Sequence, residues 1–346
     1  MLSWWNWSES ASSSYFAKDG YCFFRCYLDF CYIGSSFVFD GLVKEASGSM
    51  LDSGEINIVN QKKVKKNESI NSKSNNLVLI VEYDGSNYFG WQSQPNRRSV
   101  QTVLTQALSS ILNQPVTLHA SGRTDAGVHA LGQVINCRVK LTLTMSTLFQ
   151  ALNSYLPADI RVVHLQEAPL SFNARKDATA KEYRYWMYCG NQFPVFLRNY
   201  MFYPGDYQID WSLLKECVNL FIGIHDFTAF SASGSSVVNM VREVRQFEVH
   251  DFGSGFLSFQ IIGSGFLYKM VRIILGEVWM VQLGKKKIND LFLALSYPNR
   301  GKHRLCLPPH GLYLTKVFYS TLDLGNENRI SQFPLFYFGK EAKLLK

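Results

Sequence analysis

The sequence has few of the residues that build disulfide frameworks or metal centres. Its seven cysteines are an odd number and form no paired C-x-x-C arrangement. Four of them stand alone among apolar or strand-like residues: Cys137, Cys189, Cys217 and Cys306. This setting predicts buried thiols in a reducing compartment. Three more cluster near the N-terminus: Cys22, Cys26 and Cys31. No fourth ligand or nearby histidine completes a zinc set there, so we expect no metal site.

Long uninterrupted hydrophobic runs are also missing. The longest apolar stretch, from Tyr21 to Val43, is broken by Arg25, Asp29 and Asp40, which argues against a membrane span. Residues 1–14 have neither a basic start nor a continuous apolar run, so a secretory signal is not expected. We therefore expect a cytoplasmic protein without a membrane partner. Import into an organelle through residues 1–50 is the alternative.

Residues 1–75 differ in composition from the rest of the chain. Their first half is aromatic and serine-rich, and residues 60–75 are polar with few apolar side chains. Such a composition predicts a largely disordered N-terminal extension. A mis-assigned start is a second interpretation, because translation from Met50 would remove nothing that the later part needs.

Positive charge is concentrated after this extension. The net charge is +8, and residues 1–75 hold equal numbers of basic and acidic side chains, so the whole excess lies beyond position 75. An anionic partner such as RNA fits this distribution, and so does a merely soluble basic protein. The chain has 346 residues, which is long enough for about two domains. Its 47% of hydrophobic residues is enough for sizeable cores.

The first half of the ordered part shows the order β-α-β-β-α-β followed by one more strand. Ser99 is positioned to cap the first helix, and Ser146 starts the second, which Pro157 ends. Strands are expected at residues 77–83, from 116, and at 133–139, 160–165 and 181–188. This order is typical of a ferredoxin-like unit.

The second half again combines helices with strands, in a looser order. Asp210 caps a helix, and a long helix is expected from Phe266 to Gly284, with a shorter one at 289–296. Strands at 241–250 and 255–262 would meet at a turn over 251–254, and a last strand covers 312–319. We expect an α+β fold with two ferredoxin-like (RRM-like) subdomains, residues 76–178 and 179–325, in one largely antiparallel mixed sheet flanked by helices. The tail, residues 326–346, carries apolar side chains that suit packing back onto the body: Phe333, Leu335, Phe336 and Phe338.

A polar, glycine-punctuated loop at 120–130 carries the main candidate for chemistry. Asp125 lies between predicted strands, with Arg123 two residues before it and His129 four residues after it. An exposed carboxylate in such a loop can serve as a nucleophile or a base. The same letters also suit an ordinary turn, in which Asp125 bonds its own backbone and Gly127 takes a positive φ.

Two further stretches carry candidate binding residues. Tyr183 and Tyr185 alternate on one face of a strand, where a ring can stack on a base or simply line a half-buried sheet. Lys269 and Arg272 are three apart near the start of the long helix, where an anion is favoured. Arg272 suits either a carboxylate partner or a solvated helix surface.

Several of these stretches together resemble one known family. Residues 121–130, Ser-Gly-Arg-Thr-Asp-Ala-Gly-Val-His-Ala, are similar to the signature of the tRNA pseudouridine synthase A family. The segments 81–92, 172–175 with 180–185, 225–227, 265–272 and 311–314 resemble the same family in the same order. The resemblance runs from about Leu77 to Tyr319. Residues 302–309 depart from it, because the family usually has alanines there.

The resemblance implies an activity and roles for particular residues. It implies that uridine is isomerised to pseudouridine in the anticodon stem-loop of tRNA, by a homodimer with the pseudouridine synthase fold. It makes Asp125 the nucleophile, Tyr183 the ring stacked on the uracil and Arg272 the partner of the Asp125 carboxylate. Arg123 would steady the flipped strand, Leu312 would pack against the base, and His129 would have a structural role. No cofactor is needed, which agrees with the lack of a dinucleotide fingerprint or P-loop.

Two other functions compete with the synthase. A non-catalytic protein of the same fold would bind and refold tRNA without changing uridine. A hydrolase using Asp125 would release a free base or cut the chain, whereas isomerisation preserves RNA length and mass. The chemistry of the products separates the three.

Overall fold

The computed structural model describes residues 74–234, 237–299, 304–324 and 343–344. The predicted disordered extension, apart from its last two residues, lies outside the described residues, as do the Cys22 cluster and the apolar side chains of the tail. Within the described part no helix is long and apolar enough to cross a membrane.

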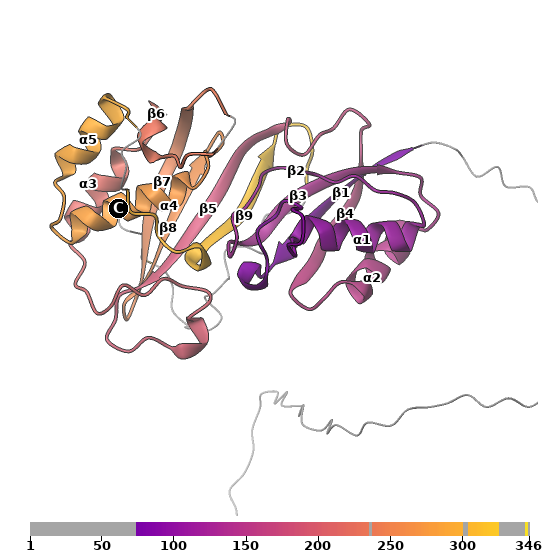
Figure 1. Ribbon diagram of the computed structural model, residues 1–346, viewed down its shortest axis with the longest axis horizontal. Coiled ribbons are helices and arrows are strands. Elements are labelled where there is room, and N and C mark those ends of the chain that lie inside the picture. The colour runs from indigo at the N-terminus through magenta and orange to yellow at the C-terminus, as the bar shows by residue number, and fades with distance from the viewer. Residues whose placement is uncertain (1–73, 235–236, 300–303, 325–342, 345–346) are drawn as a thin grey trace, which may run out of the picture. The chain divides into compact units, whose positions relative to one another are not determined.

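Ten strands of the described chain form one mixed sheet (Figure 1). Its main order is β10-β7-β8-β5-β9-β3-β1-β4, with β2 added to β3 and β6 added to β7. The strands are β1 (Asn75–Tyr83), β2 (His119–Ala120), β3 (His129–Val139), β4 (Ile160–Ala168), β5 (Ala178–Tyr188), β6 (Gly223–Asp226), β7 (Val241–Gly253), β8 (Phe256–Gly263), β9 (Leu312–Tyr319) and β10 (Lys343–Leu344).

The sheet contains two copies of the ferredoxin-like arrangement. In the first copy β1 lies between β3 and β4, and β2 pairs with β3. In the second copy β5 lies between β8 and β9, and β7 pairs with β8. The copies meet where β3 and β9 run parallel, whereas every other pairing between the described strands is antiparallel. The predicted α+β fold with a largely antiparallel sheet is thereby confirmed.

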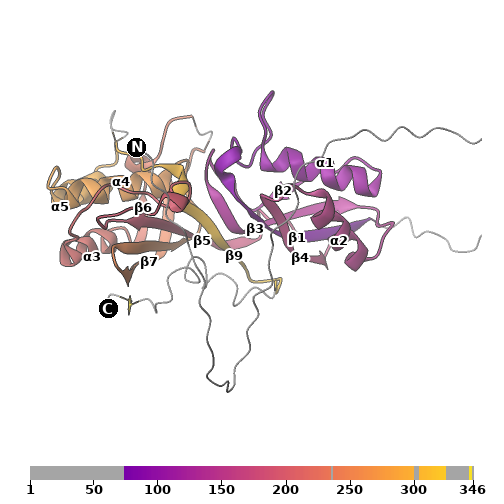
Figure 2. The ribbon, with the colours of Figure 1, turned by 90° about the horizontal axis from the view of Figure 1, so that it is seen from below.

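Five helices of the described part flank this sheet: α1 (Val100–Leu112), α2 (Met145–Tyr155), α3 (Trp211–Asn219), α4 (Met270–Gln282) and α5 (Ile288–Ser296). Figure 2 shows α1 and α2 beside β1 and β4, and α3, α4 and α5 around the half of the sheet that contains β5, β6 and β7. The predicted caps at Ser99 and Asp210 are confirmed, since their side chains accept from the backbone N–H groups of Thr102 and Leu213. Leu104 and Leu108 of α1 are fully buried, as their spacing of four predicts.

Several predicted boundaries were wrong. The long helix begins at Met270 rather than Phe266, because Lys269 takes a left-handed conformation with φ of 59° and ends the incoming segment. Lys269 therefore lies before the helix and not on it. The hairpin turn falls at Ser254 and Gly255, both with positive φ, which lets β7 continue to Gly253.

Two elements of the first half also differ from the prediction. Thr144, rather than Ser146, caps α2 by accepting from the N–H of Thr147 at 3.2 Å. The strand expected from Val116 is reduced to β2, His119–Ala120. The loop that carries Asp125 follows β2 directly and ends where β3 begins.

The cysteines of the described part are free thiols. Cys137, Cys189 and Cys217 are buried, as predicted, and burial raises the pKa of the Cys137 thiol to about 12. Cys306 is only half-buried, so the prediction was wrong for that residue, which lies before β9 rather than within a strand.

Candidate active site

Asp125 and Arg272 form an ion pair at the junction of the two halves of the sheet. One guanidinium nitrogen (Nη1) of Arg272 donates to Oδ2 of Asp125 at 2.8 Å, across 147 positions of sequence. The Arg272 residue is buried, and the side chain of Asp125 keeps 21% of its exposure. The interpretation of Arg272 as a solvated helix arginine is therefore wrong. The carboxylate is both paired and reachable.

The guanidinium of Arg272 is held from its other side as well. Its Nε donates to the carbonyl oxygen of Leu307 at 2.7 Å, and the N–H of Leu307 donates back to the carbonyl of Arg272 at 3.1 Å. Two acceptors on different sides fix the plane of a guanidinium. Arg272 is thus oriented toward Asp125 before any substrate arrives.

Segment 83–91 clamps the loop that carries Asp125. The N–H of Trp91 donates to the carbonyl of Thr124 at 3.1 Å, and the hydroxyl of Tyr83 bonds the Thr124 hydroxyl at 2.8 Å. A Cβ on Gly90 would lie 2.5 Å from the same Thr124 carbonyl oxygen. This close approach requires glycine, whose φ here is +82°.

The loop is also a turn, as its letters predict. Gly127 has φ of 76°, and the N–H of Val128 donates to the backbone carbonyl of Asp125 at 3.2 Å. The carbonyl of Asp125, and not its carboxylate, closes this turn. The two sequence interpretations are therefore compatible, because the turn leaves the carboxylate for Arg272.

His129 is the first residue of β3, which begins four residues before the predicted strand at 133–139, and only 2% of its surface is exposed. Its Nδ1 receives the N–H of Gly85 at 3.1 Å and lies 3.2 Å from Oδ1 of Asp84. Its Nε2 bonds the carbonyl of Asn199 at 3.0 Å, and the ring stacks on Tyr313. Both ring nitrogens are thus occupied by protein groups, which leaves none for a substrate proton.

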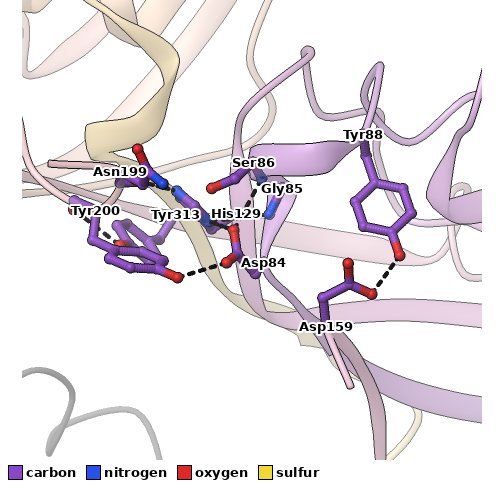
Figure 3. Close-up of polar contacts among 9 residues, drawn as sticks. All are labelled: Asp84, Gly85, Ser86, Tyr88, His129, Asp159, Asn199, Tyr200 and Tyr313. Carbon is purple, nitrogen blue, oxygen red and sulfur yellow. Dashed lines mark hydrogen bonds and ion pairs between the residues drawn. The ribbon is translucent and has the colours of Figure 1, made fainter. Parts of the chain in front are cut away.

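Asp84 joins this cluster to the segment after β5. Its Oδ2 accepts from the hydroxyl of Tyr200 at 2.7 Å, and Oδ1 accepts from the N–H of Ser86 at 2.9 Å (Figure 3). Burial opposes ionisation of Asp84, but the adjoining His129 ring and the hydrogen bonds from Ser86 and Tyr200 prevail and hold the pKa of its carboxyl well below the ordinary value. The cluster fixes the far end of the loop at 120–130 against two other segments.

The two tyrosines of β5 have different settings. Tyr185 is fully buried and donates its hydroxyl to the carbonyl of Pro308 at 2.9 Å, so it cannot present a ring to a base. Tyr183 is 7% exposed. Its ring and that of Phe266 are nearly perpendicular, with their centroids 5.2 Å apart. Burial first, and then the charges of Tyr83 and Asp125, raise the pKa of Tyr183.

The remaining predicted residues lie at the edges of this site. Arg123 is exposed on the loop. Among the described residues its side chain makes no hydrogen bond or ion pair, whereas that of Arg272 makes both. Leu312 is 6% exposed at the start of β9, opposite Tyr185 in the strand register. The structure therefore pairs Asp125 with Arg272, and leaves Arg123 free to reach outward.

Lys181 is a candidate that the sequence reasoning missed. Its ammonium would lie 3.0 Å from a Cβ on Gly122, beside the loop at 120–130. Burial, followed by the charges of Arg175 and Arg242, lowers the pKa of Lys181 to about 8. The period of two along β5 places Lys181 on the same face as Tyr183, and this signal was available in the sequence.

Comparisons with known proteins point to one family. A family model described as tRNA pseudouridine synthase matches residues 79–175 and 217–320. A protein of Caldicellulosiruptor saccharolyticus is 40% identical over 245 residues, which cover 70% of this chain and 99% of the relative. A Geobacillus relative is 41% identical over 250 residues, covering 71% and 99%.

A relative from Bacillus pumilus is 42% identical over 246 residues, which cover 70% of this chain and 98% of the relative. All three relatives carry the name tRNA pseudouridine synthase A. Each is matched along nearly its whole length, and the residues that match the family model include both Asp125 and Arg272. The chain therefore belongs to the tRNA pseudouridine synthase family, whose members are isomerases that convert uridine to pseudouridine.

Proposed function

We propose that this protein isomerises uridine to pseudouridine in the anticodon stem-loop of tRNA, with Asp125 as the nucleophile. The observation that carries this proposal is the Asp125–Arg272 ion pair, in which a reachable carboxylate is oriented by a buried arginine. A fixed charge partner orients a carboxylate toward its target, as nucleophilic catalysis requires.

The reaction rearranges bonds within one nucleotide. The bond between N1 of uracil and C1′ of ribose breaks, the base rotates, and a bond from C5 to C1′ forms. N1 then carries a proton and C5 loses one, so no oxidant, metal or energy source enters the balance. Asp125 would form a transient covalent bond to either the base or the ribose, and this bond would break when the C5–C1′ product is released.

Tyr183, Leu312 and Arg123 would surround the target nucleotide. We propose that the Tyr183 ring stacks on the uracil, that Leu312 packs against the base, and that the exposed Arg123 steadies the displaced strand. The raised pKa of Tyr183 keeps its hydroxyl protonated at neutral pH. Tyr183→Phe separates the ring from the hydroxyl: loss of turnover with retained tRNA binding would show that the hydroxyl, and not the ring alone, is needed for the reaction.

Uridines in loops and at helix ends are the expected targets. The base must leave its stack to reach Asp125, at a cost of about a few kcal/mol that is smallest where pairing is weakest. We therefore expect the purified protein to form pseudouridine in the anticodon arm of unmodified tRNA transcripts, mapped by sequencing. Pseudouridine only in other arms would overturn the target assignment.

The same incubation separates the competing functions. Release of tritium from C5-labelled uridine, with RNA length and mass unchanged, identifies the isomerase. A hydrolase would produce free uracil or a cut chain, and a non-catalytic RNA-binding protein would release no tritium.

Lys181, together with Arg175 and Arg242, would hold a phosphate of the substrate beside the loop at 120–130. None of the ion pairs among the described residues includes Lys181, Arg175 or Arg242. A phosphate would offset the burial of the ammonium, and the repulsion by Arg175 and Arg242, that lower the pKa of Lys181. Because only the protonated ammonium attracts phosphate, tRNA affinity should fall as the pH rises through about 8.

We predict that Lys181→Met weakens tRNA binding by roughly ten-fold at low salt and lowers the salt slope by about one. The variant should also lose most of the decline in affinity between pH 7 and pH 9, measured by filter binding. Lys215→Met, on the exposed surface of α3, is the matched control and should leave the pH dependence as in the wild type. An unchanged pH dependence in Lys181→Met would rule out this contact.

We also propose that the working form is a homodimer, as the family resemblance implies. One chain has a mass of 39.5 kDa, so sedimentation equilibrium separates a monomer from a dimer directly.

A further inference from the structure

A buried carboxylate lies on α4 behind the proposed catalytic pair. Glu277 is 1% exposed and follows Arg272 by five residues. Its Oε2 accepts from Nη1 of Arg304 at 2.9 Å and from the ammonium of Lys286, and its Oε1 accepts from the N–H of Leu305 at 3.2 Å. The proposed chemistry has no direct use for this group.

Two of these partners belong to a segment that runs along α4. We call residues 304–308 the strap. Where it passes Gly276, a Cβ on that glycine would lie 2.0 Å from the carbonyl oxygen of Leu305, so backbone packs directly on backbone. The strap is therefore seated on the helix at the turn that carries Glu277.

The other end of the strap contacts Arg272. The carbonyl of Leu307 accepts from Nε of Arg272 at 2.7 Å, and the N–H of Leu307 donates to the carbonyl of Arg272 at 3.1 Å. Arg272 then donates to Asp125 at 2.8 Å. A continuous series of contacts thus joins Glu277 to Asp125 through the strap.

The charge of Glu277 is what anchors the strap. A carboxylate with almost no exposure persists only when it is paired, and here it holds two cations and one backbone N–H. An amide in its place would keep the shape but leave Arg304 and Lys286 without a counter-charge. The strap would then be free to shift, and the Leu307 carbonyl with it.

We propose that Glu277 is a positioning residue for the reaction: it fixes the strap, and the strap sets the orientation of the Arg272 guanidinium toward Asp125. This inference rests on the proposed roles of Asp125 and Arg272. Its effect is on geometry, because Glu277 itself does not touch the site of chemistry. Misplacement by about 1 Å at a remote position is enough to slow a reaction strongly.

The test uses the full-length protein and C5-tritiated tRNA under single-turnover conditions. We expect Glu277→Gln to lower the maximal rate by at least about ten-fold, with tRNA affinity changed by less than about two-fold. Glu277→Asp, which keeps the charge, should restore part of the rate. Glu216→Gln, at an exposed glutamate on α3, is the matched control and should behave as the wild type.

A double-mutant cycle with Arg272→Gln separates positioning from simple stability. If Glu277 acts through Arg272, adding Glu277→Gln to Arg272→Gln should lower the rate by less than about two-fold further. A rate loss that multiplies in full, or a Glu277→Gln rate equal to that of the wild type, would overturn the proposal. If Glu277→Gln does not fold, Arg304→Met applies the same cycle from the strap side. Failure of the wild-type protein to release tritium would instead refute the proposed function.

Discussion

Replacing Asp125 with asparagine is expected to abolish pseudouridine formation. The amide has nearly the shape of the carboxylate but cannot serve as a nucleophile, and it leaves the Arg272 guanidinium without a counter-charge at 2.8 Å. We expect the single-turnover rate of tritium release to fall by about 10⁴-fold or more, the size of loss that follows removal of a nucleophile. The loop itself should survive, because its turn is closed by the backbone of Asp125.

Retained binding is the internal control for this variant. The proposed phosphate contacts lie beside the loop and do not involve the carboxylate, so tRNA affinity should change by no more than a few-fold. Asp290→Asn removes an exposed carboxylate from the start of α5 and should leave the rate as in the wild type. Turnover by Asp125→Asn at the wild-type rate would remove Asp125 from the mechanism.

Much of the fold followed from local patterns in the sequence. The apolar spacing and the Ser99 cap of α1 predicted a helix that the structure has over Val100–Leu112. The order of strands and helices in the first half predicted a ferredoxin-like unit, because that order admits few compact topologies. These features depend on neighbouring residues, so their signals are present in the sequence itself.

The errors fall where tertiary contacts decide the backbone. Phe266 and Leu267 fit the apolar spacing of α4, so the predicted helix started at Phe266. In the structure the backbone of Lys269 is left-handed, a conformation that is uncommon for lysine and that its side chain does not predict. The carbonyl of Tyr268, just before it, accepts from the N–H of Ala232 at 3.0 Å. A contact with a distant part of the chain thus holds the segment that the pattern assigned to a helix.

The site shows the same division between local and distant information. Spacing within the loop at 120–130 placed Asp125, Arg123 and His129 near one another, but it could not separate their roles. The burial of His129 between Gly85 and Asn199 depends on segments far from it in the sequence. The contact between Asp125 and Arg272 was expected only from the family resemblance, because no pattern in one sequence relates positions 147 apart.

Arg272 is expected to produce the second largest effect. Its guanidinium donates in two directions, from Nε to the Leu307 carbonyl and from Nη1 to Asp125. Arg272→Gln removes the positive charge that orients the carboxylate, and we expect the single-turnover rate to fall by about 10²–10³-fold. The reduced rate is measurable as tritium release with enzyme in excess over tRNA.

Arg272→Lys distinguishes charge from geometry. A lysine keeps the charge, but one ammonium at the end of a flexible chain cannot reproduce the fixed fork that reaches both Leu307 and Asp125. We therefore expect an intermediate rate, and a full wild-type rate would show that charge alone is sufficient. Arg245→Lys changes an exposed arginine that is paired with Glu243 on β7, and such surface pairs contribute little. That control makes the same arginine-to-lysine change outside the site. If the single-turnover rate falls only in Arg272→Lys, the reaction requires the orientation of the Arg272 guanidinium and not its charge alone. The proposed role of the strap is to set that orientation.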